Sequence, residues 1–334
     1  MKALVIHGKE DMRLEELARP EPKMGEVLMK VAYAGVCGSD LHYYFNGANG
    51  DFKVIEPLIP GHEICGWVEH DPSGKYETKT PITLHPATFG TCIPGLEKHP
   101  HLWPKGAYLG SASTKPHTQG GMSEFFLLRL DQVRVLPHSL PMKRAVLCEP
   151  LAVAMHAVNR AKSVENKDVL INGSGPIGLL VAFAALKAGA RSVRCSDLHE
   201  EPLKRSLYLG CDRGINLLKE SLPSEEFDVV FECSGSPKGI SAAIKATKRL
   251  GNLVQVGMLS PGEASVELGG FISKEVHWHG VFRFNDEIDA CIKLLANSPE
   301  LDCVLTHVLG LEEGVKAFEI AKDSKISSKV ALAL

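Results

Sequence analysis

Four residues with chemically useful side chains lie within six positions near the start of the chain. The segment "AGVCGSDLHYY", residues 34–44, contains Cys37, Ser39, Asp40 and His42 in an otherwise apolar stretch with two glycines. Such a set could supply a nucleophile with its base, or a metal ligand beside a proton path. Because a buried cysteine is also common as a small apolar residue, the segment needs partners elsewhere in the chain.

Candidate partners for Cys37 follow at two places. The segment "PGHEICG" contains adjacent His62 and Glu63, and "CEPLA" contains Glu149 at the start of an expected helix. Taken singly, these residue types are more often packing or hydrogen-bonding residues than ligands. A cysteine, a histidine and a carboxylate together form the type of catalytic zinc site that keeps one position open for water or substrate.

A glycine-rich segment in the second half predicts a dinucleotide site. "GSGPIG" places Gly173, Gly175 and Gly178 in the G-x-G-x-x-G spacing between an expected strand, "VLIN", and an expected helix, "IGLLVAFAALKAG". The first glycine makes the tight turn, the second lets the pyrophosphate approach the backbone, and the third allows close packing of the helix on the strand. We expect this loop, including Pro176 and Ile177, to bind the phosphates with the free amides of the helix N-terminus.

Further cofactor contacts are expected at the ends of neighbouring strands. Asp197 ends the next expected strand, 19 residues after Gly178. A carboxylate there binds the adenosine ribose hydroxyls and repels a 2′-phosphate, which favours NAD over NADP. Lys204 and Arg205 lie nearby and weaken that preference. The later strand ends "FECSGS" and "VQVGM" add Ser234 and Val256 as candidate contacts of the nicotinamide half.

The elements that must position these residues differ between the two halves of the chain. Up to about residue 145, short apolar or alternating runs such as "GEVLMKVAYAGV", "ICGWVEH" and "EFFLLR" are separated by Gly, Pro and Asp, as in a mostly β domain. From "CEPLAVAMHAVNRA" onward, strands and helices alternate through "KDVLING", "SVRCSD", "FDVVFECSG", "PKGISAAIKATKRL" and "GNLVQVGM". This alternation predicts an α/β protein whose second domain has a doubly wound parallel sheet.

Composition narrows the class of partner. The 334 residues are 44% apolar with a formal net charge of -3, and the charges are interleaved, so we expect a small-molecule substrate rather than nucleic acid or a membrane. The start "MKALVIHGKEDMRLEEL" meets acidic residues too early for the apolar core of a signal peptide, and no later apolar run has the length of a membrane span, so we expect a cytoplasmic location. Nine widely scattered cysteines do not suit a disulfide framework, so we expect reduced thiols.

The motifs together resemble one family. "GVCGSDLHYY", "PGHE", "CEPLAVAMHAV", "INGSGPIG" and "FECSGS" occur in the order found in zinc-dependent medium-chain alcohol dehydrogenases, and the resemblance covers nearly the whole chain. Within that superfamily the chain is most similar to the polyol branch of sorbitol, threonine and L-idonate 5-dehydrogenases. "GSDLHYYFNGANGDF", "LGSAS", "PHTQGGMSEFF" and "FRFNDEI" favour the last of these.

The resemblance implies a fold and a set of roles. A GroES-like catalytic domain of residues 1–148, completed by 284–334, would enclose a Rossmann NAD-binding domain of residues 149–283, and the enzyme would be a homodimer or homotetramer. Cys37, His62 and Glu63 match zinc ligands, and Glu149 matches a carboxylate that binds the metal directly or through water. Ser39 and His42 match a proton relay. Arg283 matches an arginine near substrate or pyrophosphate.

Several alternatives stay open at the level of sequence. L-Idonate leads as substrate by resemblance, followed by sorbitol, xylitol and threonine. A zinc-free reductase of the superfamily, or a catalytically silent NAD-binding sensor, is disfavoured by the intact ligands and relay.

One segment departs from the family pattern. Many members hold a second, structural zinc with four cysteines spaced C-x-x-C-x-x-C-x7-C. This chain has Phe89, Cys92, Gly95 and Trp103 at those positions. One thiolate cannot form a closed tetrahedral site. We therefore expect one zinc per chain, and a lobe in which Phe89 packs on Trp103.

Overall fold

The computed structural model describes residues 1–260 and 262–334, which divide into two compact units. Unit 1 comprises Met1–Glu149, Ile288–Asp323 and Lys329–Leu334, and unit 2 comprises Pro150–Glu287 and Ser324–Ser328. This division leaves Glu149 in unit 1 and residues 284–287 in unit 2. Among the described residues, no helix is long and apolar enough to cross a membrane.

Unit 1 is built mainly from β-strands, as the short apolar runs predict. Its largest sheet has seven strands in the order β11-β7-β6-β3-β19-β18, with β10 also paired to β3. The strands of the unit are β1 (Lys2–Gly8), β2 (Asp11–Glu16), β3 (Glu26–Gly35), β4 (Ala48–Asn49), β5 (Phe52–Lys53), β6 (Glu63–His70), β7 (Pro81–Leu84), β8 (Ala87–Thr88), β9 (Ala107–Tyr108), β10 (Phe125–Arg129), β11 (Val133–Val135), β18 (Leu305–Gly310) and β19 (Lys329–Ala333).

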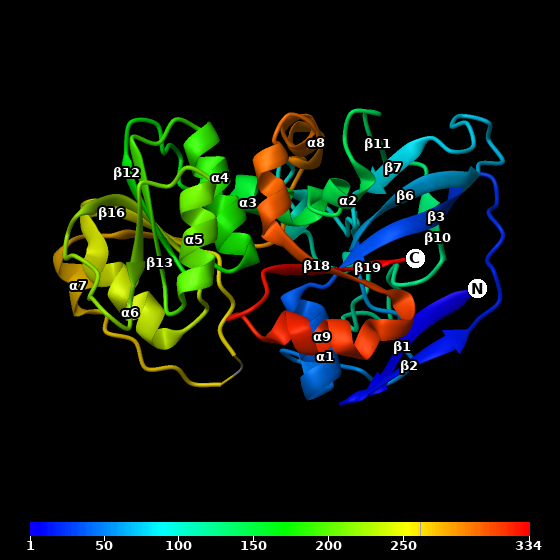
Figure 1. Ribbon diagram of the computed structural model, residues 1–334, viewed down its shortest axis with the longest axis horizontal. Coiled ribbons are helices and arrows are strands. Elements are labelled where there is room, and N and C mark those ends of the chain that lie inside the picture. The colour runs from blue at the N-terminus through cyan, green and yellow to red at the C-terminus, as the bar shows by residue number, and fades with distance from the viewer. Residues whose placement is uncertain (261) are drawn as a thin grey trace. The chain divides into compact units, whose positions relative to one another are not determined.

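The helices of unit 1 are short. They are α1 (Gly38–Asn46), α2 (Met142–Ala145), α8 (Ile288–Ala296), α9 (Gly314–Lys322) and the 3-10 turns η1 (Pro100–Leu102), η2 (Pro299–Val304) and η3 (Leu311–Glu313). Helix α9 packs on β18 and β19, and α1 follows directly after β3 (Figure 1). The C-terminal strand β19 therefore lies beside β3, which leads into the segment that carries Cys37.

The core of unit 1 follows from the alternation of side chains along its strands. On β3, Val27, Met29 and Val31 occupy alternate positions and belong to the same buried apolar cluster as Ile64 of β6 and Val330 of β19. Side chains on alternate positions point to the same face of a strand. Each fully buried side chain of this kind stabilises the fold by about 1.5–3 kcal/mol relative to leaving it exposed.

Unit 2 contains a six-stranded parallel sheet in the order β14-β13-β12-β15-β16-β17. Numbered along the chain this order is 3-2-1-4-5-6, which is that of doubly wound dinucleotide-binding sheets. Helices α4 and α5 lie on one side of the sheet and α6 lies on the other (Figure 1). The strands are β12 (Asp168–Asn172), β13 (Ser192–Asp197), β14 (Arg213–Asn216), β15 (Phe227–Glu232), β16 (Thr247–Gln255) and β17 (His277–Gly280), and the helices are α3 (Cys148–Arg160), α4 (Pro176–Lys187), α5 (Glu200–Tyr208), α6 (Pro237–Ala246) and α7 (Gly269–Ser273).

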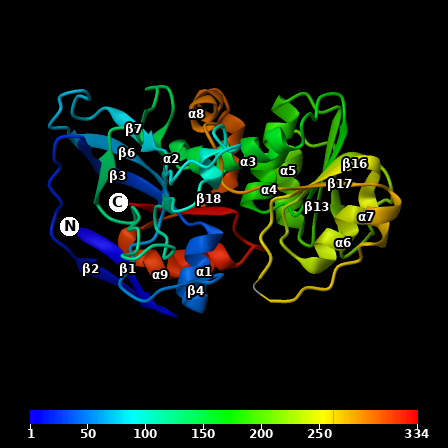
Figure 2. The same ribbon diagram turned by 180° about the vertical axis from the view of Figure 1, so that it is seen from behind.

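The expected alternation of strands and helices is confirmed, with one boundary wrong. The segment "PKGISAAIKATKRL" predicts a helix to Leu250, but α6 ends at Ala246 and Thr247 begins β16. The Thr247 hydroxyl donates to the carbonyl of Ala243 at 2.7 Å, and the chain turns from helix to strand at this β-branched residue. Strand β17 pairs with β16 and forms one edge of the sheet (Figure 2).

Candidate functional site

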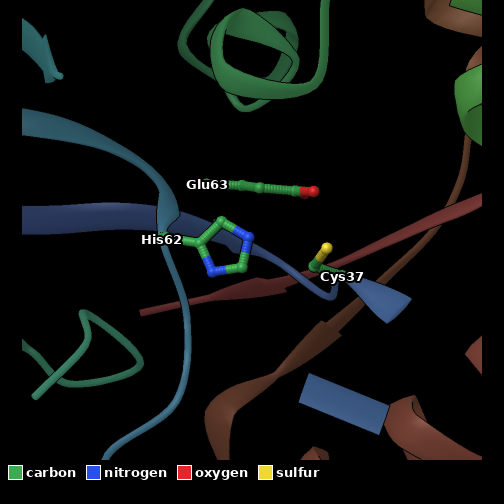
Figure 3. Close-up of side chains that lie close together, drawn as sticks. All are labelled: Cys37, His62 and Glu63. Atoms are coloured by element: carbon green, nitrogen blue, oxygen red, sulfur yellow. The ribbon is translucent and has the colours of Figure 1, made fainter. Parts of the chain in front are cut away.

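Three of the expected metal ligands meet in unit 1. One ligand atom from each of Cys37, His62 and Glu63 lies within 4.8 Å of the others, and this is the one such group that the described residues contain. Figure 3 shows the three side chains pointing toward a common centre. Cys37 directly precedes α1, and Glu63 is the first residue of β6. A thiolate, an imidazole and a carboxylate are the donors that zinc binds.

A buried aspartate holds the two ligand-bearing segments together. Asp40 accepts the backbone N–H of Cys37 at 2.9 Å with Oδ2 and that of Gly61 at 3.1 Å with Oδ1. Its side chain is fully buried, and burial raises the pKa of Asp40. Because Gly61 precedes His62, the carboxylate sets the position of the Cys37 turn relative to the start of β6.

Glu63 is oriented by a lysine from the C-terminal strand. Lys329 Nζ donates to Glu63 Oε1 at 2.6 Å and to the carbonyl of Val36 at 3.1 Å, and both charged side chains are almost fully buried. Glu63 Oε2 is buried and has no hydrogen-bond partner. It lies against Gly35, where an added Cβ would come within 2.1 Å of it. Lys329 occupies Oε1, and the absence of a side chain at Gly35 leaves space for Oε2. This second oxygen is available to a metal ion.

The charges around the cluster favour a divalent cation. Three buried carboxylates, those of Asp40, Glu63 and Glu149, face one buried ammonium group, that of Lys329. Burial lowers the pKa of His62, but the thiolate of Cys37 and the neighbouring carboxylates raise it to about 10. The site thus attracts a proton in the absence of a metal ion, and a dication compensates the same negative charge.

Glu149 does not belong to this group of three. Its carboxylate is buried at the start of α3, and Oε1 accepts the hydroxyl of Tyr108 at 2.5 Å. Burial raises the pKa of Glu149, while the charge of His62 opposes that effect. Of the two carboxylates that sequence left open as the third ligand, Glu63 lies with Cys37 and His62.

The residues of the expected proton relay share one helix. Ser39 and His42 lie three positions apart near the start of α1, so their side chains project from neighbouring turns of one face. Both residues are half-buried. Among the described residues, no hydrogen bond joins these two side chains.

The glycine loop of unit 2 has the geometry that its spacing predicts. Gly173 has a φ of 98°, and a Cβ there would meet the backbone of Ser234 at 2.7 Å. A Cβ on Gly178 would lie 1.9 Å from the carbonyl oxygen of Gly173, whereas one on Gly175 would meet nothing within 4 Å. Gly173 and Gly178 therefore permit close backbone packing. Gly175 leaves open space before Pro176, the first residue of α4.

Asp197 is tied to that loop. Its Oδ2 accepts the backbone N–H of Ser174 at 2.9 Å, and its Oδ1 accepts that of His199 at 3.0 Å. The carboxylate thus lies at the end of β13, beside the glycine turn. Each of its oxygens accepts one backbone N–H and has a second lone pair that can accept a ribose hydroxyl.

The remaining expected cofactor residues lie on neighbouring loops of unit 2. Ser234 follows β15 and donates its hydroxyl to the buried carboxylate of Glu232, and Val256 follows β16. Arg283 follows β17, has a φ of 54°, and places its guanidinium 4.6 Å from the ring centre of Phe282. Ile177 is the second residue of α4.

Sequence reasoning missed Lys329 and Tyr108. A signal for Lys329 existed, since "KVALAL" is a buried strand that begins with a charged residue, and buried lysines are rare without a partner. Tyr108 had no such signal, because its contact with Glu149 joins residues 41 positions apart.

The lobe that departs from the family pattern is closed by aromatic contacts. The rings of Phe89 and Trp103 meet edge to face with centres 6.4 Å apart, which confirms the expected packing. The indole N–H of Trp103 donates to the carbonyl of Leu96 at 2.7 Å. Aromatic pairs of this geometry contribute about 0.5–1.5 kcal/mol beyond the area they bury.

Two family models match the chain. Residues 23–138 match the alcohol dehydrogenase GroES-like domain, and residues 176–297 match the zinc-binding dehydrogenase domain. These matches and the strand order of unit 2 confirm the expected fold class.

Several known proteins are similar over nearly the full length. L-Idonate 5-dehydrogenase (NAD(P)(+)) of Escherichia coli strain K12 is 31% identical over 89% of this chain and 88% of its own length. Sorbitol dehydrogenase of Bos taurus is 34% identical over 96% of this chain and 92% of its own. The crystal structure of L-idonate 5-dehydrogenase from Escherichia coli superposes with a TM-score of 0.94 and 30% identity, covering 100% of this chain and 98% of that one.

Proposed function

We propose that this chain, which belongs to the zinc-dependent polyol and sugar-acid dehydrogenases of the zinc-binding alcohol dehydrogenase family, transfers a hydride from a secondary hydroxyl of a sugar acid or polyol to NAD. The single observation that carries the proposal is the convergence of Cys37, His62 and Glu63 in unit 1. A family member without these donors would lack the means to hold a catalytic metal.

We assign Cys37, His62 and Glu63 as the zinc ligands. The orphaned Glu63 Oε2 and the excess of buried carboxylates support the assignment. Glu149 is the additional carboxylate of the site, within reach of the metal through water. A bound zinc ion supplies a Lewis acid for the substrate hydroxyl, and a bound NAD supplies the hydride acceptor.

The chain's own residues handle the proton and the geometry. Ser39 takes up the proton of the substrate hydroxyl as it gives up its own, and His42, one turn further along α1, receives the released proton and delivers it to solvent. Asp40 keeps the Cys37 turn and the His62 segment in register through its two backbone hydrogen bonds. Lys329 holds the Glu63 carboxylate in place through a buried ion pair.

We assign unit 2 as the NAD-binding domain and unit 1 as the catalytic domain. Gly173, Gly175, Pro176, Ile177 and Gly178 form the pyrophosphate loop. Asp197 binds the adenosine ribose and favours NAD over NADP, and Ser234, Val256 and Arg283 line the remainder of the cofactor site. The open space at Gly175 and the position of Asp197 beside the turn support these roles.

L-Idonate is the leading substrate, followed by sorbitol, xylitol and threonine. Similarity to L-idonate 5-dehydrogenase and to sorbitol dehydrogenases supports this order. We further propose that the enzyme acts in the cytoplasm as a homodimer or homotetramer. The edge strand β17 supports an oligomer, because Trp278 on it is 37% exposed and its outer side pairs with no strand of the described chain.

The proposal is tested by incubating the zinc-loaded protein with each candidate substrate and either NAD or NADP. We expect NADH formation with at least one sugar acid or polyol, and loss of that activity after chelation. Activity that survives complete removal of zinc would contradict the proposal. So would tight NADH binding without turnover on any substrate at full zinc occupancy.

A further inference from the structure

One hydrogen bond links the second carboxylate of the metal site to a distant part of unit 1. The hydroxyl of Tyr108 donates to Glu149 Oε1 at 2.5 Å, and each residue is only 6% exposed. A short, buried hydrogen bond to a carboxylate is among the stronger side-chain contacts in proteins. Glu149 is therefore held in one orientation by Tyr108.

Tyr108 is itself positioned by the two-stranded sheet of β8 and β9. It belongs to β9, where it pairs with Ala87 of β8, and the N–H of Leu109 donates to the carbonyl of Pro86 at 3.2 Å. Its ring meets that of His62 edge to face with centres 5.4 Å apart. Tyr108 thus contacts the expected ligand His62 with its ring and Glu149 with its hydroxyl.

Glu149 lies near the cluster, because the Tyr108 side chain that donates to it also packs against the ring of His62. Nevertheless the group of mutually close ligand atoms contains Glu63 and excludes Glu149. The two carboxylates differ in the group that holds them. Glu149 accepts a hydrogen bond from the Tyr108 hydroxyl, whereas Glu63 accepts one from Lys329.

We propose that Tyr108 is a positioning residue that keeps Glu149 off the metal, so that three protein ligands bind it and the fourth position stays open for substrate. This inference rests on the proposed zinc site. It assigns a role to the hydroxyl group of Tyr108, which phenylalanine at the same position would lack.

Removing the hydroxyl of Tyr108 is expected to strengthen zinc binding. In Tyr108→Phe the ring and its packing on His62 remain, but Glu149 loses its hydrogen-bond donor inside a buried site. A buried carboxylate without a donor is costly, and coordination of the nearby dication compensates it. Glu149 then becomes a fourth protein ligand. Zinc binds more tightly, while the position needed by the substrate is filled.

The experiment measures zinc affinity by competition with a chelator and the visible spectrum of the cobalt-substituted protein. For Tyr108→Phe we expect the zinc Kd to fall about tenfold or more, a shift in the cobalt spectrum, and a lower kcat with unchanged affinity for NADH. A change in outer contacts typically alters metal affinity about 10–100-fold, and a purely structural loss would weaken binding instead.

Two variants make the test specific. In Glu149→Gln the amide oxygen still accepts from Tyr108 but carries no charge, so we expect the cobalt spectrum of the unmodified protein, together with a higher zinc Kd because one buried negative charge beside the site is lost. The double variant Tyr108→Phe with Glu149→Gln should lose the gain in affinity. If Glu149→Gln shifts the cobalt spectrum, Glu149 is already a ligand and the inference is overturned, whether or not Tyr108→Phe folds.

The two levels of failure are distinguishable. If the unmodified protein binds no zinc, or binds it independently of Cys37, the proposed function fails and this inference with it. If zinc binding depends on Cys37 but Tyr108→Phe leaves both the Kd and the cobalt spectrum unchanged, the inference alone is wrong.

Discussion

Gly35→Ala is expected to disrupt the metal site from outside the ligand set. Gly35 ends β3 and pairs across the sheet with Glu63 of β6. A Cβ at Gly35 would lie 2.1 Å from Glu63 Oε2, whereas an ordinary van der Waals contact begins at 3.4 Å, so the carboxylate must move by about 1.3 Å. Metal–ligand distances tolerate deviations of only about 0.2 Å. Glu63 is then lost as a ligand.

The expected magnitude follows from that displacement. We expect the zinc affinity of Gly35→Ala to fall at least about 10–100-fold, as in proteins whose ligand surroundings are altered. Overpacking should also cost about 1–3 kcal/mol of the free energy of unfolding of the metal-free protein. The assay is chelator competition for zinc, with thermal unfolding of the metal-free protein alongside it.

Gly38→Ala is the matched control. A Cβ at Gly38, the first residue of α1, would meet nothing within 4 Å, so zinc affinity should stay within about threefold of that of the unmodified protein. The reasoning is refuted if Gly35→Ala binds zinc as tightly as Gly38→Ala does.

Two further predictions concern unit 2. Burial raises the pKa of Glu287, but hydrogen bonds from His156, Asn285 and Asn159 lower it from 4.5 to about 2. The ionised form is therefore stabilised in the folded state. Glu287→Gln should lower the free energy of unfolding by about 1–3 kcal/mol above pH 4.5, and this difference should vanish as the pH falls toward 2. Urea unfolding at a series of pH values measures the difference, and a difference that does not change with pH would contradict the prediction. Asp197→Ala should reduce the ratio of kcat/KM for NAD to that for NADP by about tenfold or more, because the carboxylate that repels a 2′-phosphate is lost; steady-state kinetics with both cofactors measure the ratio, and an unchanged ratio would contradict the assigned role.

Local patterns predicted much of the fold because they report local physics. The G-x-G-x-x-G spacing fixes a turn whose backbone contacts only glycine permits, and Gly173 and Gly178 have those contacts in the structure. The alternating runs of unit 1 and the strand–helix alternation of unit 2 likewise depend on near neighbours in sequence. The end of α6 could not be placed, since "TKRL" continues the helical pattern and Thr247 joins β16 through pairing with β15.

The choice between the two candidate carboxylates lay outside such patterns. It depends on Lys329, which is 266 positions from Glu63, and on Tyr108, which is 41 positions from Glu149. Neither pairing leaves a periodic trace in the sequence. The ligand types could be inferred from chemistry, but which of the two carboxylates lies with Cys37 and His62 depends on tertiary contacts.

The most direct test of the central claim is the zinc content of the purified protein and of Cys37→Ser. Because Cys37, His62 and Glu63 form the one close group of such donors among the described residues, we expect about one zinc per chain in the unmodified protein. The content should fall to near zero in Cys37→Ser, although the variant keeps its binding of NADH. About two zincs per chain, or one that persists in Cys37→Ser, would contradict the assignment of the catalytic metal site.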